Sequence, residues 1–142
     1  MTTAWTAADV ARIGEEAVPA VPLVTGIDRT GLADGIVYWD MWPVQDQAGY
    51  PASIAGRELW MALSAPDRGD PSLRHFEARI RLLERRAAGW RDLGPVLPDD
   101  RPVPYEREWA GSAVTDGRRI SLYFTAAGTA ERPGGYQQRL FE

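Results

Sequence analysis

One acidic side chain in this sequence stands between two indoles. Asp40 is flanked by Trp39 and Trp42, and Pro43 follows directly. A carboxylate can attack or stabilise an anomeric carbon, and flat aromatic faces can stack on the C–H surfaces of a sugar ring. The segment therefore contains the residue types that a sugar-processing site needs. The residues also allow a second interpretation, an aromatic cluster beneath a turn in which Asp40 hydrogen-bonds to nearby backbone.

The composition argues against several other kinds of site. The 142 residues contain no cysteine and a single histidine, His75, too few for a thiolate site, a histidine-based metal centre or a Ser/His/Asp relay. A net charge of −4 gives no basic surface for nucleic acid or an anionic membrane. No apolar run approaches the ~20 residues of a membrane span, and the N-terminus lacks the pattern of a signal peptide. We expect no metal, no cofactor, no nucleic-acid partner and no membrane partner.

A short helix is expected near the N-terminus. Thr6 can cap it, because Asp9 stands at the third helical position and can return a hydrogen bond. Trp5 and Val10 have the spacing of a hydrophobic staple across this cap. The helix is predicted to end near Gly14.

The Asp40 segment is expected at the end of a strand. Prolines at two positions within residues 17–25 predict extended chain before it, and residues 36–38 are a β-prone run that leads to Asp40. Residues 45–53 contain glycine and proline and are predicted to turn. The apolar run at residues 58–64 then predicts a buried strand.

Further short strands are expected in the second half of the chain. Residues 78–83 fit a helical stripe by composition and a strand by alternation, so the pattern leaves both open. Residues 90–97 and 136–141 are predicted strands. Asp116-Gly117 before the strictly alternating residues 120–125 is the strongest hairpin signal in the chain. Close spacing of short strands predicts antiparallel all-β structure.

Three blocks of sequence resemble one family of enzymes. YWDMWPVQDQAGYPASIAGRELWMALS, at residues 38–64, resembles the first conserved block of glycoside hydrolase family 68, the levansucrases, inulosucrases and related β-fructofuranosidases, which contains Trp-Asp-x-Trp-Pro. EWAGSAVTDGRRISLYFTA, at residues 108–126, resembles the Glu-Trp-Ser-Gly-Ser-Ala block of that family. AWTAADVARI, at residues 4–13, is similar to the start of many members.

The resemblance implies a fold and a domain organisation. The family fold is a five-bladed β-propeller, of which residues 36–142 would form the first blade and part of the second. Residues 1–35 would form the N-terminal helix and an extended segment. The resemblance favours a strand at residues 78–83. We expect an N-terminal fragment of such an enzyme, with one chain of a split enzyme and a non-catalytic fructoside- or protein-binding β module as the alternatives.

The resemblance also implies roles for particular residues. Asp40 matches the family's catalytic nucleophile, and Trp39 and Trp109 match indoles that line the fructosyl pocket. The implied activity is levansucrase-like transfer of fructosyl groups from sucrose to fructan acceptors or water, through a covalent intermediate. Trp42, Ala110 and Ser112 are expected to contact the residues that bind the substrate and to hold them in position. Ala110 stands where the family has a serine that donates a hydrogen bond to the nucleophile.

Two further motifs of the family are missing at the expected distance. They are Arg-Asp-Pro, with the transition-state-stabilising aspartate, and Glu-Arg-Pro, with the acid/base glutamate. Residues 131–133 spell Glu-Arg-Pro soon after Trp109, but in a glycine-rich loop, and we interpret this as coincidence. We therefore expect the chain to be inactive alone and to need the remaining C-terminal portion of a propeller. The family is typically extracellular, whereas no signal peptide is evident in this sequence, which leaves a cytoplasmic location open.

Overall fold

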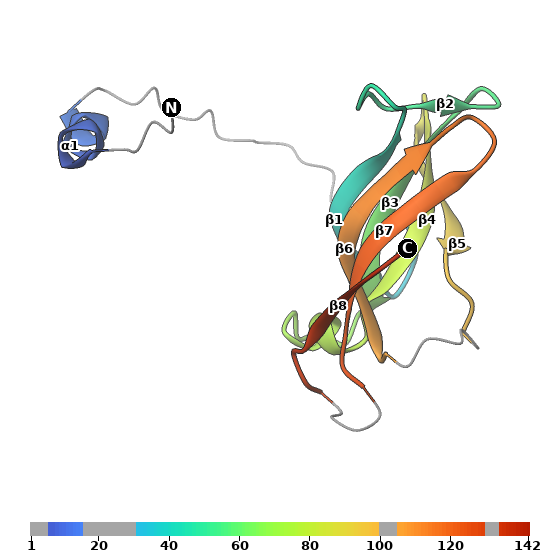
Figure 1. Cartoon of the computed structure of the whole chain (residues 1–142). Helices are drawn as coiled ribbons and strands as arrows, with labels where there is room; N and C mark the ends of the chain where they lie inside the picture. The colour runs from blue at the N-terminus through green and yellow to red at the C-terminus, as the bar shows by residue number, and fades with distance from the viewer. Residues whose placement is uncertain (1–5, 16–30, 100–104, 130–133) are drawn as a thin grey trace.

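The computed structural model describes residues 6–15, 31–99, 105–129 and 134–142, and most of these form β-strands (Figure 1). The predicted all-β class is thereby confirmed. None of the described helices is long and apolar enough to cross a membrane. The elements are, in chain order, α1 (Ala7–Glu15), β1 (Ile36–Gln45), β2 (Ser53–Ile54), β3 (Arg57–Pro66), the 3-10 turn η1 (Leu73–Phe76), β4 (Arg79–Arg86), β5 (Gly89–Pro95), β6 (Arg107–Thr115), β7 (Ile120–Ala127) and β8 (Gln138–Phe141).

The strands form two antiparallel units that meet side by side. The sheet order is β5-β4-β3-β1-β6-β7-β8, with β2 paired to β3. Strands β1 to β5 pair only antiparallel to one another, and so do β6, β7 and β8. The units join where β1 and β6 run parallel, through the pairs Val44–Ala113 and Gln45–Val114. Adjacent blades of a propeller, each a small antiparallel sheet, have this kind of arrangement.

The segment at residues 78–83 is a strand, as the family resemblance favoured. Strand β4 pairs with β3 on one side and β5 on the other, so backbone hydrogen bonds on both edges outweigh its helical composition. Ile80 and Leu83 are fully buried on it. Tertiary pairing and burial decide the structure of this segment.

The predicted Asp-Gly hairpin joins β6 and β7. Thr115 pairs with Ile120, so residues 116–119 form the turn. The Asp116 carboxylate accepts hydrogen bonds from the backbone N–H groups of Arg118 and Arg119, both at 2.8 Å. Gly117 has a φ of 88°, the left-handed conformation that glycine adopts without strain.

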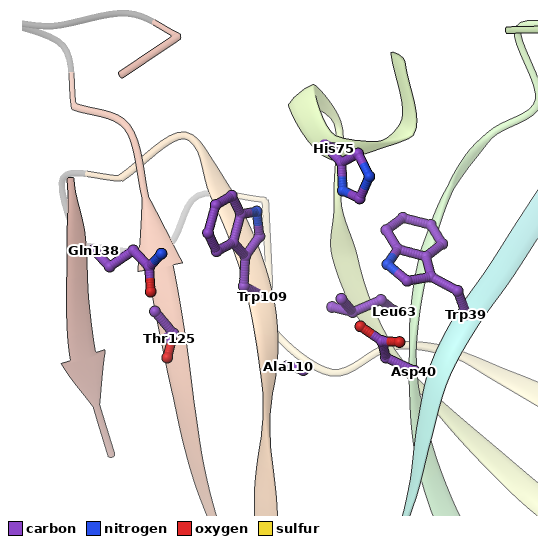
Figure 2. A pocket seen from close by; sticks show the side chains of 8 residues that line it. All are labelled: Trp39, Asp40, Leu63, His75, Trp109, Ala110, Thr125 and Gln138. Atoms are coloured by element: carbon purple, nitrogen blue, oxygen red, sulfur yellow. The ribbon is translucent and has the colours of Figure 1, made fainter. Parts of the chain in front are cut away.

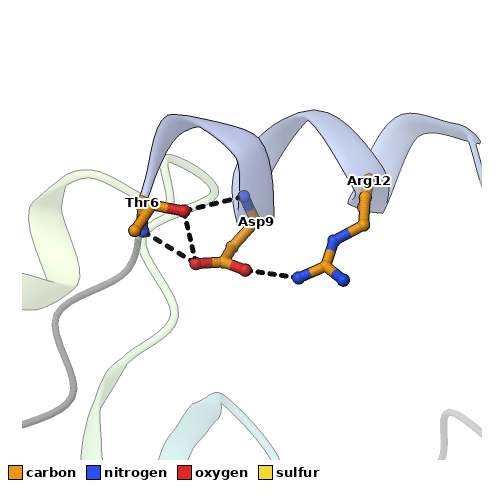
Figure 3. A network of polar contacts seen from close by, with 3 residues as sticks. All are labelled: Thr6, Asp9 and Arg12. Atoms are coloured by element: carbon orange, nitrogen blue, oxygen red, sulfur yellow. Dashed lines mark hydrogen bonds and ion pairs between the residues drawn. The ribbon is translucent and has the colours of Figure 1, made fainter.

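The predicted cap of α1 is also present (Figure 3). The Asp9 N–H donates to Thr6 Oγ1 at 3.2 Å, and the Thr6 N–H donates to Asp9 Oδ2 at 3.0 Å. These reciprocal bonds form the capping box expected from the spacing. Arg12 forms an ion pair with Asp9 one turn later. The proposed staple involves Trp5, which lies outside the described residues, as does the extended segment predicted at 17–25.

One hydrophobic core serves both units. Its buried members come from β1, β3 and β4 of the first unit and from β6, β7 and the segment before β6 of the second: Val44, Leu59, Met61, Leu63, Ile80, Tyr105, Ala113, Phe124 and Ala126. Because the units share this core, a site formed between them has a fixed geometry.

A buried carboxylate ties β6 across the first unit. Glu108 is 0% exposed, and its Oε2 accepts the Ile80 N–H at 2.6 Å. Arg79 Nε lies 2.9 Å from Glu108 Oε1, and the Glu108 N–H donates to the Ala78 carbonyl at 2.9 Å. A buried charge is tolerated when it is paired and hydrogen-bonded in this way. The start of β6 is therefore held firmly against β4.

Candidate active site between the two units

Asp40 lies at a β-bulge in the middle of β1. The strand pairs with β3 through Trp39–Leu63 and then Met41–Ala62, so Asp40 is an extra residue with no partner in the ladder. Its φ is 46°, a left-handed conformation that aspartate tolerates better than most residues. A bulge turns a side chain away from its regular direction without ending the strand. The prediction that Asp40 lies at the end of a strand is therefore wrong, because β1 continues past it to Gln45.

A second bulge lies in β6, beside the first. Glu108 pairs with Ala126 and Gly111 with Phe124, so Trp109 and Ala110 together stand opposite a single residue of β7, Thr125. A Cβ atom at position 111 would clash with the Tyr123 carbonyl oxygen, so the close approach of the two strands requires glycine there.

The two bulges open onto one cavity of about 360 Å³, within the usual range of small-molecule sites, roughly 300–1,000 Å³. In Figure 2 the indoles of Trp39 and Trp109 stand on opposite sides, with the Asp40 carboxylate between their strands and His75 at the upper edge. Asp40 is the single carboxylate among the lining residues. Those residues are Trp39, Asp40, Leu63, His75, Trp109, Ala110, Thr125 and Gln138.

The residues predicted for the site do not all reach this cavity. Trp39, Asp40, Trp109 and Ala110 line it, whereas Trp42 and Ser112 do not. Trp42 is half-buried and packs against the hydrophobic core. Ser112, which was expected to support the site, is exposed and pairs with Tyr123 of β7.

The wall formed by Trp39 is supported by η1. The imidazole of His75 packs edge-on against the Trp39 indole, with ring centroids 6.0 Å apart. The Arg74 guanidinium carbon lies 5.2 Å from the centroid of the same indole, a cation–π distance. No local sequence pattern places Arg74 or His75 at the site, because they approach Trp39 only through the tertiary pairing of β1 with β3.

A polar network holds β1 just before the site. The Tyr38 hydroxyl donates to Asp92 Oδ2 at 2.7 Å, and Arg81 Nη2 lies 2.7 Å from the same oxygen. Burial, followed by the hydrogen bond to Asp92, raises the pKa of Tyr38 to about 12. Burial acts to raise the pKa of Asp92, but hydrogen bonds from Arg81, Tyr38 and the Gly94 N–H outweigh it and lower that pKa.

The donor set of the cavity does not suit a metal ion. Throughout the part of the chain that the structure describes, no three His, Cys, Asp or Glu side chains come together to form a metal site. The cavity offers one carboxylate, aromatic faces and hydroxyl and amide groups, and this combination suits stacking and hydrogen bonding to an uncharged polar ligand.

Comparison with known proteins identifies relatives of this chain. The family model described as Levansucrase/Invertase, that of glycoside hydrolase family 68, matches residues 1–141. A levansucrase of Fructilactobacillus sanfranciscensis is 31% identical over 109 residues, which are 72% of this chain and 12% of the relative. The chain spans between 12% and 33% of the length of the curated relatives it matches.

Solved structures give the same result. The inulosucrase from Halalkalicoccus jeotgali bound to kestose matches with a TM-score of 0.70 and 34% identity, over 80% of this chain and 28% of that one. A Bacillus subtilis levansucrase variant in complex with oligosaccharides matches at 0.68 and 24% identity, over 87% of this chain and 29% of that one, which shows the fold. These neighbours are β-propellers, and the two antiparallel units correspond to part of one. The chain therefore belongs to glycoside hydrolase family 68, the levansucrase and invertase family.

Proposed function

We propose that this chain supplies the nucleophile side of a fructosyl-transfer site that acts on sucrose. The observation that carries the proposal is the placement of Asp40 between the indoles of Trp39 and Trp109 by two adjacent bulges. Membership of the family supports the roles proposed for Asp40, Trp39 and Trp109. The acceptors of the fructosyl group are a growing fructan and water.

The reaction follows the retaining pattern. An Asp40 carboxylate oxygen forms a bond to the anomeric carbon of the fructosyl unit while the glycosidic bond breaks, and the glucose oxygen takes a proton from an acid. The acceptor hydroxyl then attacks the same carbon, loses its proton to the same acid/base group and releases Asp40. The indole faces suit the C–H surface of the furanose ring in both steps.

The proposed mechanism needs a nucleophile and a separate acid/base group, and the described cavity offers one carboxylate. The acid/base group of a retaining enzyme lies about 5 to 5.5 Å from the nucleophile, and Asp40 is the single carboxylate among the described lining residues. Glu131 of the Glu-Arg-Pro run lies outside the described residues. We expect a further portion of a propeller, in the same or another polypeptide, to supply the proton donor.

The test is glucose release from sucrose, measured for the purified chain alone and for a mixture with the downstream portion of a family member. We expect no release by the chain alone and measurable release by the mixture. Asp40→Asn should abolish that release, and Ser112→Ala, on the same strand as Trp109 but outside the cavity, should leave it unchanged. Robust release by the chain alone would overturn the half-site proposal.

A non-catalytic fructoside-binding module is the second candidate, because the described cavity holds a single carboxylate. In that case neither the chain nor the mixture releases glucose, while the chain still binds a fructan oligosaccharide. Asp40→Asn would then leave binding nearly unchanged, whereas Trp109→Ala would weaken it, since stacking provides the affinity.

A further inference from the structure

We propose that Arg107 is a positioning residue that fixes the Trp109 indole in the cavity wall, an inference that rests on the proposed function. Arg107 stands two residues before Trp109 on β6, so both side chains lie on the same side of the strand. Glu108, between them, points the other way and binds the backbone of β4.

Arg107 is buried among aromatic rings. Its side chain is 1% exposed, and its guanidinium carbon lies 5.5 Å from the ring centroids of both Phe76 and Tyr136 and 5.9 Å from that of Trp109. The rings come from η1, from the segment before β8 and from β6 itself. Trp109 and Tyr136 also contact each other, with centroids 6.1 Å apart. Attraction between a cation and an aromatic face is strongest when the cation is removed from water, and this guanidinium is buried.

The guanidinium is anchored independently of Trp109. Arg107 Nη2 donates to the Gly135 carbonyl at 2.6 Å, and Nη1 lies 3.0 Å from Glu106 Oε2. That carboxylate oxygen also accepts the Gly134 N–H at 2.9 Å. A Cβ atom at position 128 would clash with the Glu106 carboxylate, so glycine at the end of β7 makes room for the pair. The indole therefore rests against a cation whose position other groups determine.

This arrangement links the two walls of the cavity. In η1, Arg74 and His75 contact Trp39, while Phe76, the next residue, contacts Arg107. One 3-10 turn and one arginine thus set the separation of the two indoles. A change at Arg107 should alter how well the cavity holds a furanose ring and leave the carboxylate of Asp40, on the neighbouring strand, in place.

The experiment uses fluorine NMR of the full chain labelled with 5-fluorotryptophan, with sucrose as the probe ligand. Loss of one resonance in Trp109→Phe assigns that indole, and Trp60→Phe assigns a control indole that packs on Trp90 in the first unit. In sugar-free protein, Arg107→Met should shift and broaden the Trp109 resonance and leave the Trp60 resonance unchanged. Sucrose should bind about tenfold more weakly to this variant, and Arg107→Lys should restore part of the loss, because it keeps the charge but not both anchoring contacts.

Because Arg107 is buried, a second variant protects the test against misfolding. Phe76 is 43% exposed and contacts the Arg107 guanidinium, so Phe76→Leu should fold and should move the Trp109 resonance in the same direction as Arg107→Met. An unmoved Trp109 resonance in folded Arg107→Met, or in Phe76→Leu where the first variant does not fold, overturns the inference. If that resonance moves but the chain binds no sucrose, the positioning role of Arg107 is supported. In that case only the proposed function is contradicted.

Discussion

Ala110 lines the same cavity as Asp40 and carries only a methyl group. It lies at the β6 bulge, on the strand next to that of Asp40 (Figure 2). Its methyl group cannot donate a hydrogen bond, whereas a hydroxyl at this position could. Ala110→Ser would therefore add a possible hydrogen-bond donor to the cavity that Asp40 also lines.

In an assembled enzyme, Ala110→Ser should raise kcat/KM for sucrose. A hydrogen bond to a charged group contributes about 1.5 to 3 kcal/mol, which corresponds to an increase of at most about 10- to 160-fold. Activity should also extend to lower pH, because the new bond favours the carboxylate. The measurement is kcat/KM across the pH range, with Ser112→Ala as the control. A pH profile that does not move would rule out this account of Ala110.

Asp92 should make stability depend on pH. Its lowered folded-state pKa means that its contribution is present above the unfolded value, about 3.9, and is lost as pH falls through the folded value. Asp92→Asn should therefore lower the free energy of unfolding by about 2 kcal/mol at pH 7, since it breaks a mostly buried ion pair. Urea unfolding at pH 7 and pH 3 measures the difference, which should shrink at the lower pH.

The control for that measurement is an exposed ion pair. Glu77 pairs with Arg68 at 2.9 Å, and both side chains are about half exposed, at 41% and 55%. Glu77→Gln should change the free energy of unfolding at pH 7 by less than about 1 kcal/mol. An equal loss for Asp92→Asn at pH 7 and pH 3 would contradict the linkage to its titration.

At the scale of elements, the hairpin and the cap of α1 could be predicted because their signals are local. The Asp116-Gly117 turn and the Thr6–Asp9 box each depend on residues within a few positions of one another. The strand at β4 could not be predicted from its pattern alone, since pairing on both edges overrides its helical propensity.

The two bulges at the site could not be predicted from the sequence either. The Trp-Asp spacing pointed to a site, but no local pattern shows that Asp40 leaves the ladder or that β6 carries a matching bulge. His75 and Gln138 reach the cavity from connections and an outer strand that are distant in sequence from Asp40. Their approach depends on how the two units pack, which becomes evident only in the folded chain.

The β6 bulge should be sensitive to a single methyl group. Gly111→Ala places a Cβ atom against the Tyr123 carbonyl, so β6 and β7 must separate or the bulge must move. We expect a loss of about 2 to 3 kcal/mol in the free energy of unfolding, a typical overpacking penalty. Urea denaturation measures it, and Ser112→Ala, at the next and exposed position, is the control. Equal stability of the two variants would show that the strands can separate freely.

At the scale of the molecule, the described sheet has two outer strands, β5 and β8. Leu140, on β8, is 76% exposed, and Phe141 beside it belongs partly to the shared core. An outer strand with an exposed apolar side chain can pair with another copy of the same chain. This surface is the one through which we expect the chain to self-associate.

Leu140→Lys should reduce that self-association. The added charge opposes pairing at the sheet edge and removes the apolar contact. Sedimentation velocity over a range of protein concentrations should show a larger monomer fraction for the variant. Tyr50→Lys is the matched control, because Tyr50 is 69% exposed on the turn after β1, away from β8. A monomer fraction that responds equally to both substitutions would exclude the β8 edge as the contact.

The left-handed backbone at Asp40 makes the stability of the fold depend on the residue type at this position. The conformation favours glycine, asparagine or aspartate, so glycine at position 40 would fold at least as well as aspartate. Asp40→Gly should therefore keep or raise the free energy of unfolding, whereas Asp40→Ala should lower it by about 1 kcal/mol in urea denaturation. Asparagine preserves both the shape of the side chain and the preference of the backbone, so Asp40→Asn should remove the carboxylate while leaving the bulge and the free energy of unfolding nearly unchanged.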